Sequence, residues 1–232
     1  MKPLVTALIL LLTVAANAQR HFRLNDASKI VDVGIEVGTC DMGDSGTCSP
    51  LIVNFFRKRA TKLFQTIRLA KTSMWDAVPK ANVINLYDDQ SVINFGDYNF
   101  DGSEDVAICD GSNGGYGGSS YQVYLYLPTS RRFIHSASFT RLVQGMNLGM
   151  FETDKKKKMH YVYSKSGCCW HQTEGYDVFG GRPRKVYEFT EDAMIGDGHM
   201  RVTTKKLVRG RWRVRTKSYN ESEYYEKLET KK

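Results

Sequence analysis

The chain is a succession of short apolar segments separated by turn-forming residues, and many of these segments alternate between apolar and polar positions. Such alternation is typical of strands with one buried face, because successive side chains of a strand point to opposite sides. No stretch shows a long, clean period of 3.6 residues with capping signals. The segments that predict strands are 30–37, 51–56, 63–69, 83–87, 92–95, 121–127, 133–142, 159–164, 176–179, 185–189 and 200–208.

Some neighbouring segments are expected to pair as hairpins. Segments 51–56 and 63–69 are joined by a basic turn, and residues 88–91 separate segment 83–87 from segment 92–95. Many short strands at fairly regular spacing predict an all-β fold of short antiparallel strands, either β-propeller-like or a β-sandwich. The charged residues 221–232 are expected to fray or to form a short helix.

Residues 1–18 have the pattern of a secretory signal peptide. Lys2 supplies the positive charge, residues 4–14 the apolar stretch, and Ala16-Asn17-Ala18 a cleavage site with small residues at its first and third positions. No later segment is apolar enough to predict a transmembrane helix, so we expect no membrane insertion. We therefore expect residues 19–232 to fold as a single all-β domain that is periplasmic or secreted.

The formal net charge is +8, and a basic, alternating segment near the end of the chain contributes much of it. In a strand, this alternation places all the cations of the segment on one face. That face is either a solvated outer surface or a docking surface for an acidic partner, and nucleic acid is a poor candidate because the protein is exported. The cations are Arg209, Arg211, Arg213, Arg215 and Lys217.

The segment 97–105, with the sequence DYNFDGSED, has the pattern of a cation-binding loop. Asp97, Asn99 and Asp101 place oxygen-bearing side chains at alternate positions, Gly102 provides a sharp turn, and Asp105 closes the set. Calcium takes about six to eight oxygen ligands, and neighbouring carboxylates repel one another unless a cation lies between them. We predict a structural Ca²⁺ site formed by Asp97, Asn99, Asp101, Ser103 and Asp105.

The loop differs from a helix-loop-helix calcium motif. That motif needs a bidentate Glu at its twelfth position, which is Ile108 here. Residues 106–109 form an apolar, partly β-branched run, so the expected unit is strand, cation loop, strand. The alternative is a polar hairpin turn without a metal.

The five cysteines of an exported chain predict disulfides. Cys40 and Cys48 flank a flexible turn and are expected to form a bridge. Cys168 and Cys169 are adjacent, so either one of them pairs with Cys109 or the two form a vicinal bridge. The odd count leaves room for one free thiol.

A glycine-rich loop directly follows the predicted strand 106–109. It contains Gly114, Gly115, Gly117 and Gly118 around Tyr116, and Ser119 follows. Glycine permits left-handed backbone conformations and close approach by a partner, and a rigid aromatic side chain suits an interface anchor. The alternative is a flexible loop whose tyrosine folds back onto the surface.

These features together resemble a group of periplasmic, calcium-binding, β-propeller-like proteins. Its best understood member is an immunity protein that inhibits a lysozyme-like effector of a bacteria-killing type IV secretion system, and the group is similar to inhibitors of invertebrate-type lysozymes. The resemblance rests on Phe95 to Asp105, Val106-Ala107-Ile108, Gly114 to Ser119, Tyr121 to Tyr124, and Ser164 to His171. It extends over a family-like core of about residues 83–189.

The resemblance implies that the protein inhibits a lysozyme-like peptidoglycan hydrolase. The loop Gly114, Gly115, Tyr116, Gly117, Gly118 and Ser119 would enter the cleft of the target, with Tyr116 at its tip, and calcium would hold the preceding strand. The bound Ca²⁺ would then be structural, and the protein would not be an enzyme.

Two other functions are open at this point. No serine elbow, zinc helix or other catalytic motif is recognisable, although Cys168, Cys169 and His171 lie close enough in sequence to suggest a zinc site. A cell-envelope module that binds glycan or has a structural role, without inhibitory activity, is the main alternative. Its support is the aromatic content of 12% and the basic segment.

Overall fold

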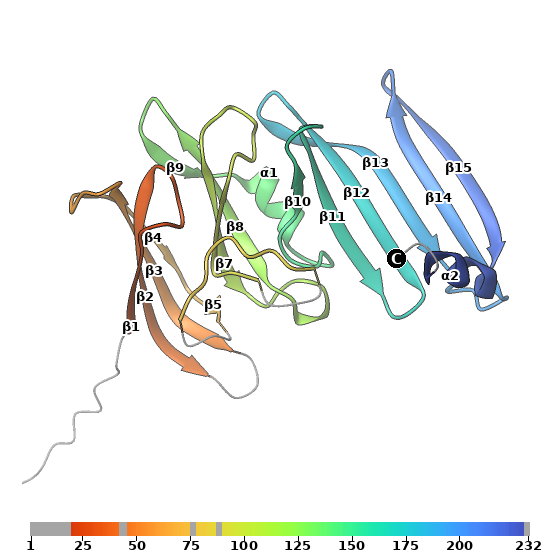
Figure 1. The fold of residues 1–232 in the computed structure, drawn as a ribbon, viewed down its shortest axis with the longest axis horizontal. Helices are drawn as coiled ribbons and strands as arrows, with labels where there is room; N and C mark the ends of the chain where they lie inside the picture. Colours follow the sequence, from red (N-terminus) through yellow and green to blue (C-terminus); the bar gives the residue numbers. More distant parts are fainter. Residues whose placement is uncertain (1–19, 42–45, 75–77, 87–89, 230–232) are drawn as a thin grey trace, which may run out of the picture.

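The computed structural model describes residues 20–41, 46–74, 78–86 and 90–229, so the signal peptide predicted for residues 1–18 lies outside the described residues. The described chain forms three antiparallel sheets that follow one another in sequence order (Figure 1). The prediction of an all-β fold with antiparallel strands is confirmed.

Each sheet is built mainly from strands that are consecutive in the chain. The first sheet, sheet A, contains β1 (Arg20–Leu24), β2 (Val31–Asp41), β3 (Thr47–Arg57), β4 (Leu63–Leu69) and β5 (Thr72–Ser73). The middle sheet, sheet B, contains β6 (Ile93–Gly96), β7 (Asp105–Gly111), β8 (Ser120–Leu127) and β9 (Arg132–His135). The last sheet, sheet C, contains β10 (Glu152–Asp154), β11 (Met159–Ser166), β12 (Trp170–Phe179), β13 (Arg182–Asp192), β14 (His199–Val208) and β15 (Arg211–Asn220).

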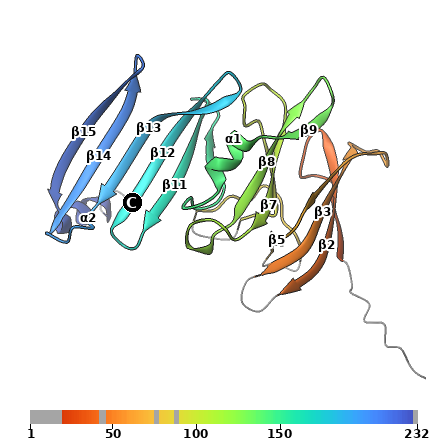
Figure 2. The same cartoon turned by 180° about the vertical axis from the view of Figure 1, so that it is seen from behind.

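Four short helical elements complete the described structure. The 3₁₀ turn η1 (Gly115–Gly117) lies between β7 and β8, and the pair α1 (Ala137–Thr140) and η2 (Arg141–Val143) follows β9. The last helix, α2 (Glu221–Glu229), packs against β14 and β15 (Figure 2). None of the helices in the described ranges has the length and apolar character needed to cross a membrane.

Sheet B is buried on both faces, and β7 shows why its sequence is continuously apolar. Val106 and Ile108 belong to a core shared with sheet A, whereas Ala107 and Cys109 belong to a second core. Successive side chains of a strand alternate between its two faces, so a strand between two packed layers needs apolar residues at every position. The sheets therefore stack as in a β-sandwich, with sheet B shared by two cores.

The core between sheets A and B follows from strict alternation in β2 and β3. Val33, Ile35 and Val37 are fully buried, and they pack with the rings of Phe55 and Phe133. These two rings lie 4.8 Å apart between centroids. Burial of such side chains contributes roughly 1.5–3 kcal/mol each.

The second core joins sheet B to sheet C through α1 and η2. Phe139, Leu142 and Val143 present one apolar face at helical spacing and pack with Tyr121 and Phe151. The predicted strand 133–142 is therefore wrong beyond His135. The chain turns at Ser136, where the Ser136 amide donates to Val123 O and Ser136 O accepts from the Thr140 amide.

The hairpin predicted for residues 83–95 is formed only in part. Strand β6 begins at Ile93, and residues 83–86 are not in a strand, although the Ser91 amide donates to Val83 O at 3.0 Å. Strand β6 instead forms its backbone hydrogen bonds with β7, to which it is antiparallel. Residues 87–89 of the predicted hairpin lie outside the described residues.

The basic segment forms the hairpin of β14 and β15, and β15 is an edge strand of sheet C. Residues 211–218 are all exposed. Four cations of β15 share one face, because they occupy alternate positions of the strand and pair with alternate positions of β14. They are Arg211, Arg213, Arg215 and Lys217. The predicted alternation is confirmed for these four cations, but it is wrong for Arg209, which lies in the turn between β14 and β15 with φ 50°. Figure 1 shows that this edge is the part of sheet C farthest from sheet B.

Candidate functional site

The predicted cation loop connects β6 to β7 and is tightly turned. The Asp97 carboxylate accepts hydrogen bonds from the amides of Asp101 at 3.0 Å and Gly102 at 2.9 Å. Gly102 has φ +88°, a backbone conformation that residues with a side chain rarely adopt. A substitution there would be strained although the space around an added Cβ is open. The alternate spacing of the acidic residues thus folds into a compact turn whose carboxylates lie next to backbone amides.

Asp105 lies at the end of this loop, fully buried at the start of β7. Its carboxylate accepts from the amides of Tyr98 at 2.8 Å, Asn99 at 3.3 Å and Tyr126 at 2.8 Å. Burial raises the pKa of Asp105 to about 7, against the lowering effect of these amides. Asp105 therefore fastens the loop to β8, and its negative charge lacks a counter-charge among its hydrogen-bond partners.

The donor set of the loop fits a hard cation in chemistry and spacing. Asp97, Asn99 and Asp101 are partly or fully exposed oxygen donors on one turn, and the buried Asp105 carboxylate would be stabilised by a nearby positive charge. In the part of the chain that the structure describes, however, no three His, Cys, Asp or Glu side chains form a group arranged to hold a metal ion. The calcium site therefore remains a prediction.

The glycine-rich loop presents Tyr116 at the surface in a fixed position. Tyr116 has φ 56° and ψ 31°, a left-handed conformation that is uncommon for a residue with a side chain. Its side chain is 62% exposed. Its hydroxyl accepts from the Gly167 amide, and the Lys165 ammonium lies 4.8 Å from the ring centroid. Tyr116 is thus neither buried nor freely moving: it is oriented by the turn between β11 and β12.

The glycines on either side of Tyr116 are needed for close backbone contacts. The Gly115 amide donates to Asn147 O at 2.8 Å, and the Gly118 amide donates to Gly115 O at 3.0 Å. A Cβ added at Gly115 would lie 2.5 Å from Met146 O, and one added at Gly114 would lie 2.8 Å from Gly118 O. The loop Gly114–Ser119 is therefore held by backbone hydrogen bonds, and its tyrosine lies against the turn between β11 and β12.

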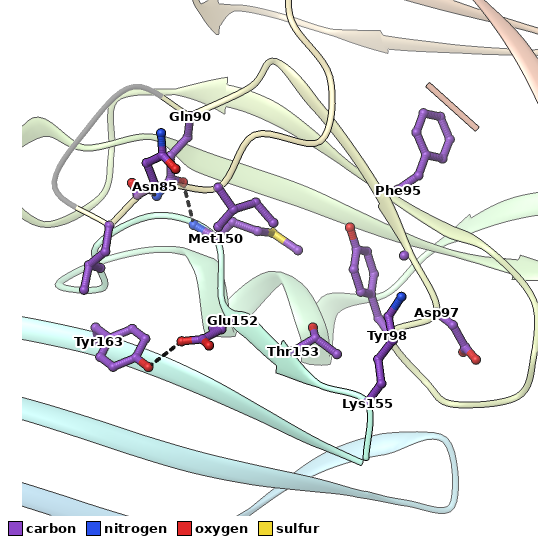
Figure 3. Close-up of a pocket in the computed structure, with 13 residues that line it drawn as sticks. Asn85, Gln90, Phe95, Asp97, Tyr98, Met150, Glu152, Thr153, Lys155 and Tyr163 are labelled. Atoms are coloured by element: carbon purple, nitrogen blue, oxygen red, sulfur yellow. Dashed lines mark hydrogen bonds between the residues drawn. The ribbon is translucent and has the colours of Figure 1, made fainter. Parts of the chain in front are cut away.

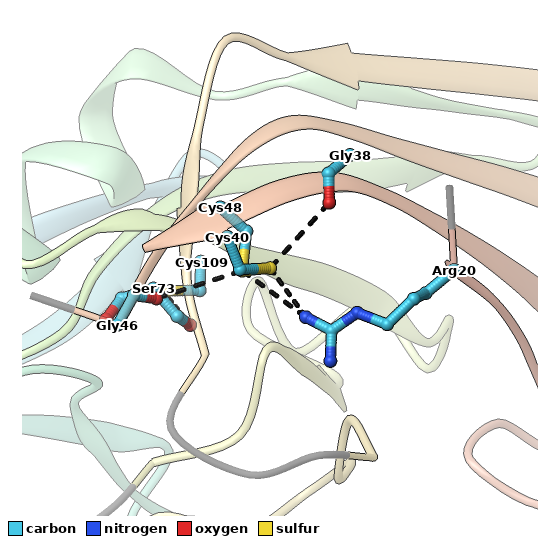
Figure 4. The surroundings of a disulfide bond; sticks show 7 residues. All are labelled: Arg20, Gly38, Cys40, Gly46, Cys48, Ser73 and Cys109. Carbon is cyan, nitrogen blue, oxygen red and sulfur yellow. Dashed lines mark hydrogen bonds between the residues drawn. A yellow bond between two sulfur atoms is a disulfide. The ribbon is translucent and has the colours of Figure 1, made fainter. Parts of the chain in front are cut away.

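The cysteines form two bridges and leave one free thiol. Cys40 and Cys48 are bonded across paired positions of β2 and β3, with the Arg20 guanidinium donating to the Cys40 sulfur (Figure 4). The predicted bridge is confirmed. Cys168 and Cys169 form the vicinal bridge, which settles that open choice.

Cys109 is therefore not paired with either of the adjacent cysteines. It lies buried in β7, where burial raises the pKa of its thiol. The bridge between Cys168 and Cys169 also removes the thiolates that a zinc site with His171 would need.

A pocket of about 640 Å³ lies between the cation loop and sheet C (Figure 3). Phe95, Tyr98 and Met150 supply apolar walls, and Asp97, Glu152 and Lys155 supply charges. The Tyr163 hydroxyl donates to Glu152 at 2.7 Å across its floor. No sequence pattern predicts this pocket, because its lining comes from segments more than 50 residues apart.

Several residues that support the Tyr116 loop also escaped the sequence analysis. Lys165 and Gly167 belong to the segment that carried the resemblance, but nothing in the sequence links them to Tyr116. Asn147, which accepts from the Gly115 amide, lies in a segment of no regular pattern. A contact of this kind becomes visible only when sheets B and C are packed together.

Comparison with solved structures reveals a likeness in fold. The chain is similar to a solved structure of a Xanthomonas type IV secretion system related protein, with a TM-score of 0.66 and 21% sequence identity over 87% of this chain and 95% of that one. No protein-family model and no curated protein matches the chain. At this identity the likeness shows a shared fold.

Proposed function

We propose that this protein is an exported, calcium-binding inhibitor of a lysozyme-like peptidoglycan hydrolase, and that the loop Gly114–Ser119 inserts Tyr116 into the cleft of its target. The observation that carries the proposal is the combination of exposure and fixation at Tyr116. Tyr116 is 62% exposed, yet backbone hydrogen bonds and the Gly167 amide hold the loop in one arrangement.

Fixation favours binding because less conformational freedom is lost when the complex forms. A projecting phenol can both stack in a cleft and donate a hydrogen bond to the carboxylates that glycosidases use for catalysis. On binding, the hydrogen bond from the Gly167 amide to the Tyr116 hydroxyl would either be replaced by a contact with the target or be retained in the complex.

The basic edge of sheet C lies away from Tyr116, although the Lys165 ammonium is beside the Tyr116 ring. The cationic face of β15 lies at the far edge of sheet C, and β12, β13 and β14 separate it from the strand that carries Lys165. A target that approaches Tyr116 therefore need not meet the basic edge, where like charges would slow association.

In this proposal a calcium ion bound by Asp97, Asn99, Asp101, Ser103 and Asp105 has a structural role. The ion would compensate the buried Asp105 carboxylate and stabilise the start of β7, the strand that leads to the Tyr116 loop. The protein would work in the periplasm or outside the cell. The similar fold of the Xanthomonas protein supports a connection with a type IV secretion system.

The test begins with affinity capture from periplasmic extracts and from secretions of competing bacteria, with identification of retained proteins by mass spectrometry. Captured hydrolases and a panel of lysozymes are then assayed by the clearing of peptidoglycan suspensions. Wild-type protein should inhibit at least one of these enzymes, and Tyr116→Ala should inhibit it about tenfold less well or worse, as expected for an interface anchor.

Phe179→Ala is the matched control, because Phe179 is an aromatic residue that is 69% exposed but lies at the other end of β12. It should inhibit like the wild type. Absence of inhibition across the panel, or equal inhibition by Tyr116→Ala, would contradict the proposal.

A further inference from the structure

One face of sheet C carries a double row of aromatic side chains. Residues paired across neighbouring strands share a face. Tyr161, Gly175 and Tyr187 form one row across β11, β12 and β13. Tyr163, Thr173 and Phe189 form the next row, two residues along. The four aromatic residues are only partly buried, so they remain accessible on this face.

The middle strand has small residues where the outer strands have rings. Gly175 has no side chain, and a Cβ added there would lie 2.9 Å from both the Met159 methyl and the Tyr187 Cβ, so these neighbours pack over its backbone. The aromatic side chains of β11 and β13 are separated by two strand spacings, which is about 10 Å. A shallow furrow of about 740 Å³ follows, lined by Tyr161, Tyr163, Thr173, Tyr187 and Phe189.

The furrow continues in both directions from Tyr163. On one side Tyr163, Glu152 and Lys155 also line the 640 Å³ pocket next to the cation loop (Figure 3). On the other side Tyr163 and Thr173 line a smaller cavity of about 280 Å³ that reaches α2. The three cavities share lining residues and follow one another from the cation loop to α2, an arrangement that suits a linear polymer better than a compact ligand.

Cations lie along both borders of the furrow. Lys155, Lys156 and Lys157 line it at the turn between β10 and β11. On the opposite border the Lys206 ammonium lies 5.9 Å from the Tyr187 ring centroid, and Arg213 is paired with Lys206 on the same face.

The carboxylates of the furrow are already engaged by neighbouring groups. Glu152 accepts from Tyr163, Asp154 pairs with Lys157 at 2.8 Å, and Glu191 accepts from the Tyr224 hydroxyl. The Asp154 charge offsets that of Lys157, whereas a hydroxyl donor leaves the charges of Glu152 and Glu191 in place. The cations Lys155, Lys156, Lys206 and Arg213 still outnumber these two carboxylates along the furrow.

We infer that this furrow is a second binding site, separate from the Tyr116 loop, and that it binds an anionic glycan strand. Flat sugar rings stack on aromatic side chains through their C–H faces, and Lys and Arg bind the carboxylates of an acidic sugar. An acidic peptide would match the cations as well, but it has no need of aromatic rings on both sides of a small-residue floor. The site would hold the protein on an acidic cell-envelope polymer.

The test uses the full mature chain with two anionic probes, short oligogalacturonate by titration calorimetry and purified peptidoglycan sacculi by sedimentation. Neutral chito-oligosaccharide and polyglutamate are the comparison ligands. At least one anionic glycan should bind more tightly than both comparison ligands, and added salt should weaken binding. Tyr187→Ala should weaken it about tenfold, the effect expected for loss of one aromatic contact.

Lys206→Gln changes an exposed side chain, so it tests the charge of the furrow without disturbing the fold, and it should also weaken binding. Trp212→Ala is the matched aromatic control, because Trp212 pairs with Leu207 on the opposite face of sheet C. Trp212→Ala and Tyr116→Ala should both bind like the wild type. No binding of either anionic glycan, equal or tighter binding of polyglutamate, or unchanged binding by Tyr187→Ala or by Lys206→Gln would overturn the inference.

Discussion

Lowering the pH should destabilise this protein through His160, a fully buried histidine of β11. Its Nε2 donates to Tyr98 O at 2.7 Å, and its Nδ1 accepts from the Thr153 hydroxyl at 3.0 Å. The Phe151 and Phe100 rings lie 4.4 Å and 4.9 Å from the imidazole between centroids. A positive charge in these surroundings would lose its hydration without gaining a directly bonded carboxylate.

Burial lowers the pKa of His160 from 6.5 to about 4, although the carbonyl of Tyr98 and the charge of Asp97 act in the opposite direction. The unfolded chain therefore binds a proton at His160 at a higher pH than the folded chain does. The stabilisation is complete above about pH 6.5 and is lost as the pH falls toward 4. The expected loss in the free energy of unfolding is about 2 kcal/mol at pH 5 and about 3 kcal/mol at pH 4.

The buried Asp105, whose pKa is raised to about 7, acts in the opposite direction over the same pH range, so the loss due to His160 is measured as a difference between wild type and His160→Gln. Urea unfolding curves of both proteins are followed by circular dichroism between pH 8 and pH 4 at constant ionic strength and constant calcium. His160→Gln removes the titrating group, so its free energy of unfolding should rise relative to that of the wild type as the pH falls. His21→Gln, at an exposed position of β1, is the control and should keep the wild-type profile. If His160→Gln and the wild type fall in parallel, burial of His160 does not cause the pH dependence.

Three further predictions concern the metal, the glycine-rich loop and the thiols. Calcium at about 100 times its Kd should raise Tm by roughly 5–10 °C relative to the Tm measured in EDTA. Asp101→Asn should reduce this increase. Equal Tm values with calcium and with EDTA would contradict calcium binding. Gly115→Ala should destabilise the protein by about 1–3 kcal/mol in urea unfolding, because its Cβ would lie 2.5 Å from Met146 O, whereas no loss would show that the backbone can move there. A thiol reagent should label none of the described cysteines in the folded protein and only Cys109 after unfolding without reductant, as mass spectrometry can check; a second labelled cysteine would exclude one of the bridges.

Local patterns were sufficient for most of the strands and for one disulfide. The alternation of Val33, Ile35 and Val37 predicts a strand with one buried face, and the continuous apolar run 106–109 predicts a buried strand. Cys40 and Cys48 flank a short turn, so their pairing follows from a hairpin. Such features depend on neighbours in sequence, which is why they can be predicted from the chain alone.

Local patterns failed where packing decided the conformation. The apolar residues of segment 133–142 fit a strand as well as a short helix, and the helical face of Phe139 and Leu142 was selected by the space between sheets B and C. The partners of Asp105 likewise come from two segments, since Tyr98 precedes it by a few residues and Tyr126 lies on the next strand.

The sequence alone determined the class of the fold, the turned acidic loop and the position of a glycine-flanked tyrosine in the chain. The tertiary structure decided what surrounds them: the Gly167 amide that orients Tyr116, the vicinal bridge that leaves Cys109 free, and the aromatic furrow of sheet C. The physical reason is that hydrophobic periodicity specifies which face of a strand is buried, whereas the pairing of distant faces depends on how whole sheets stack and fill space.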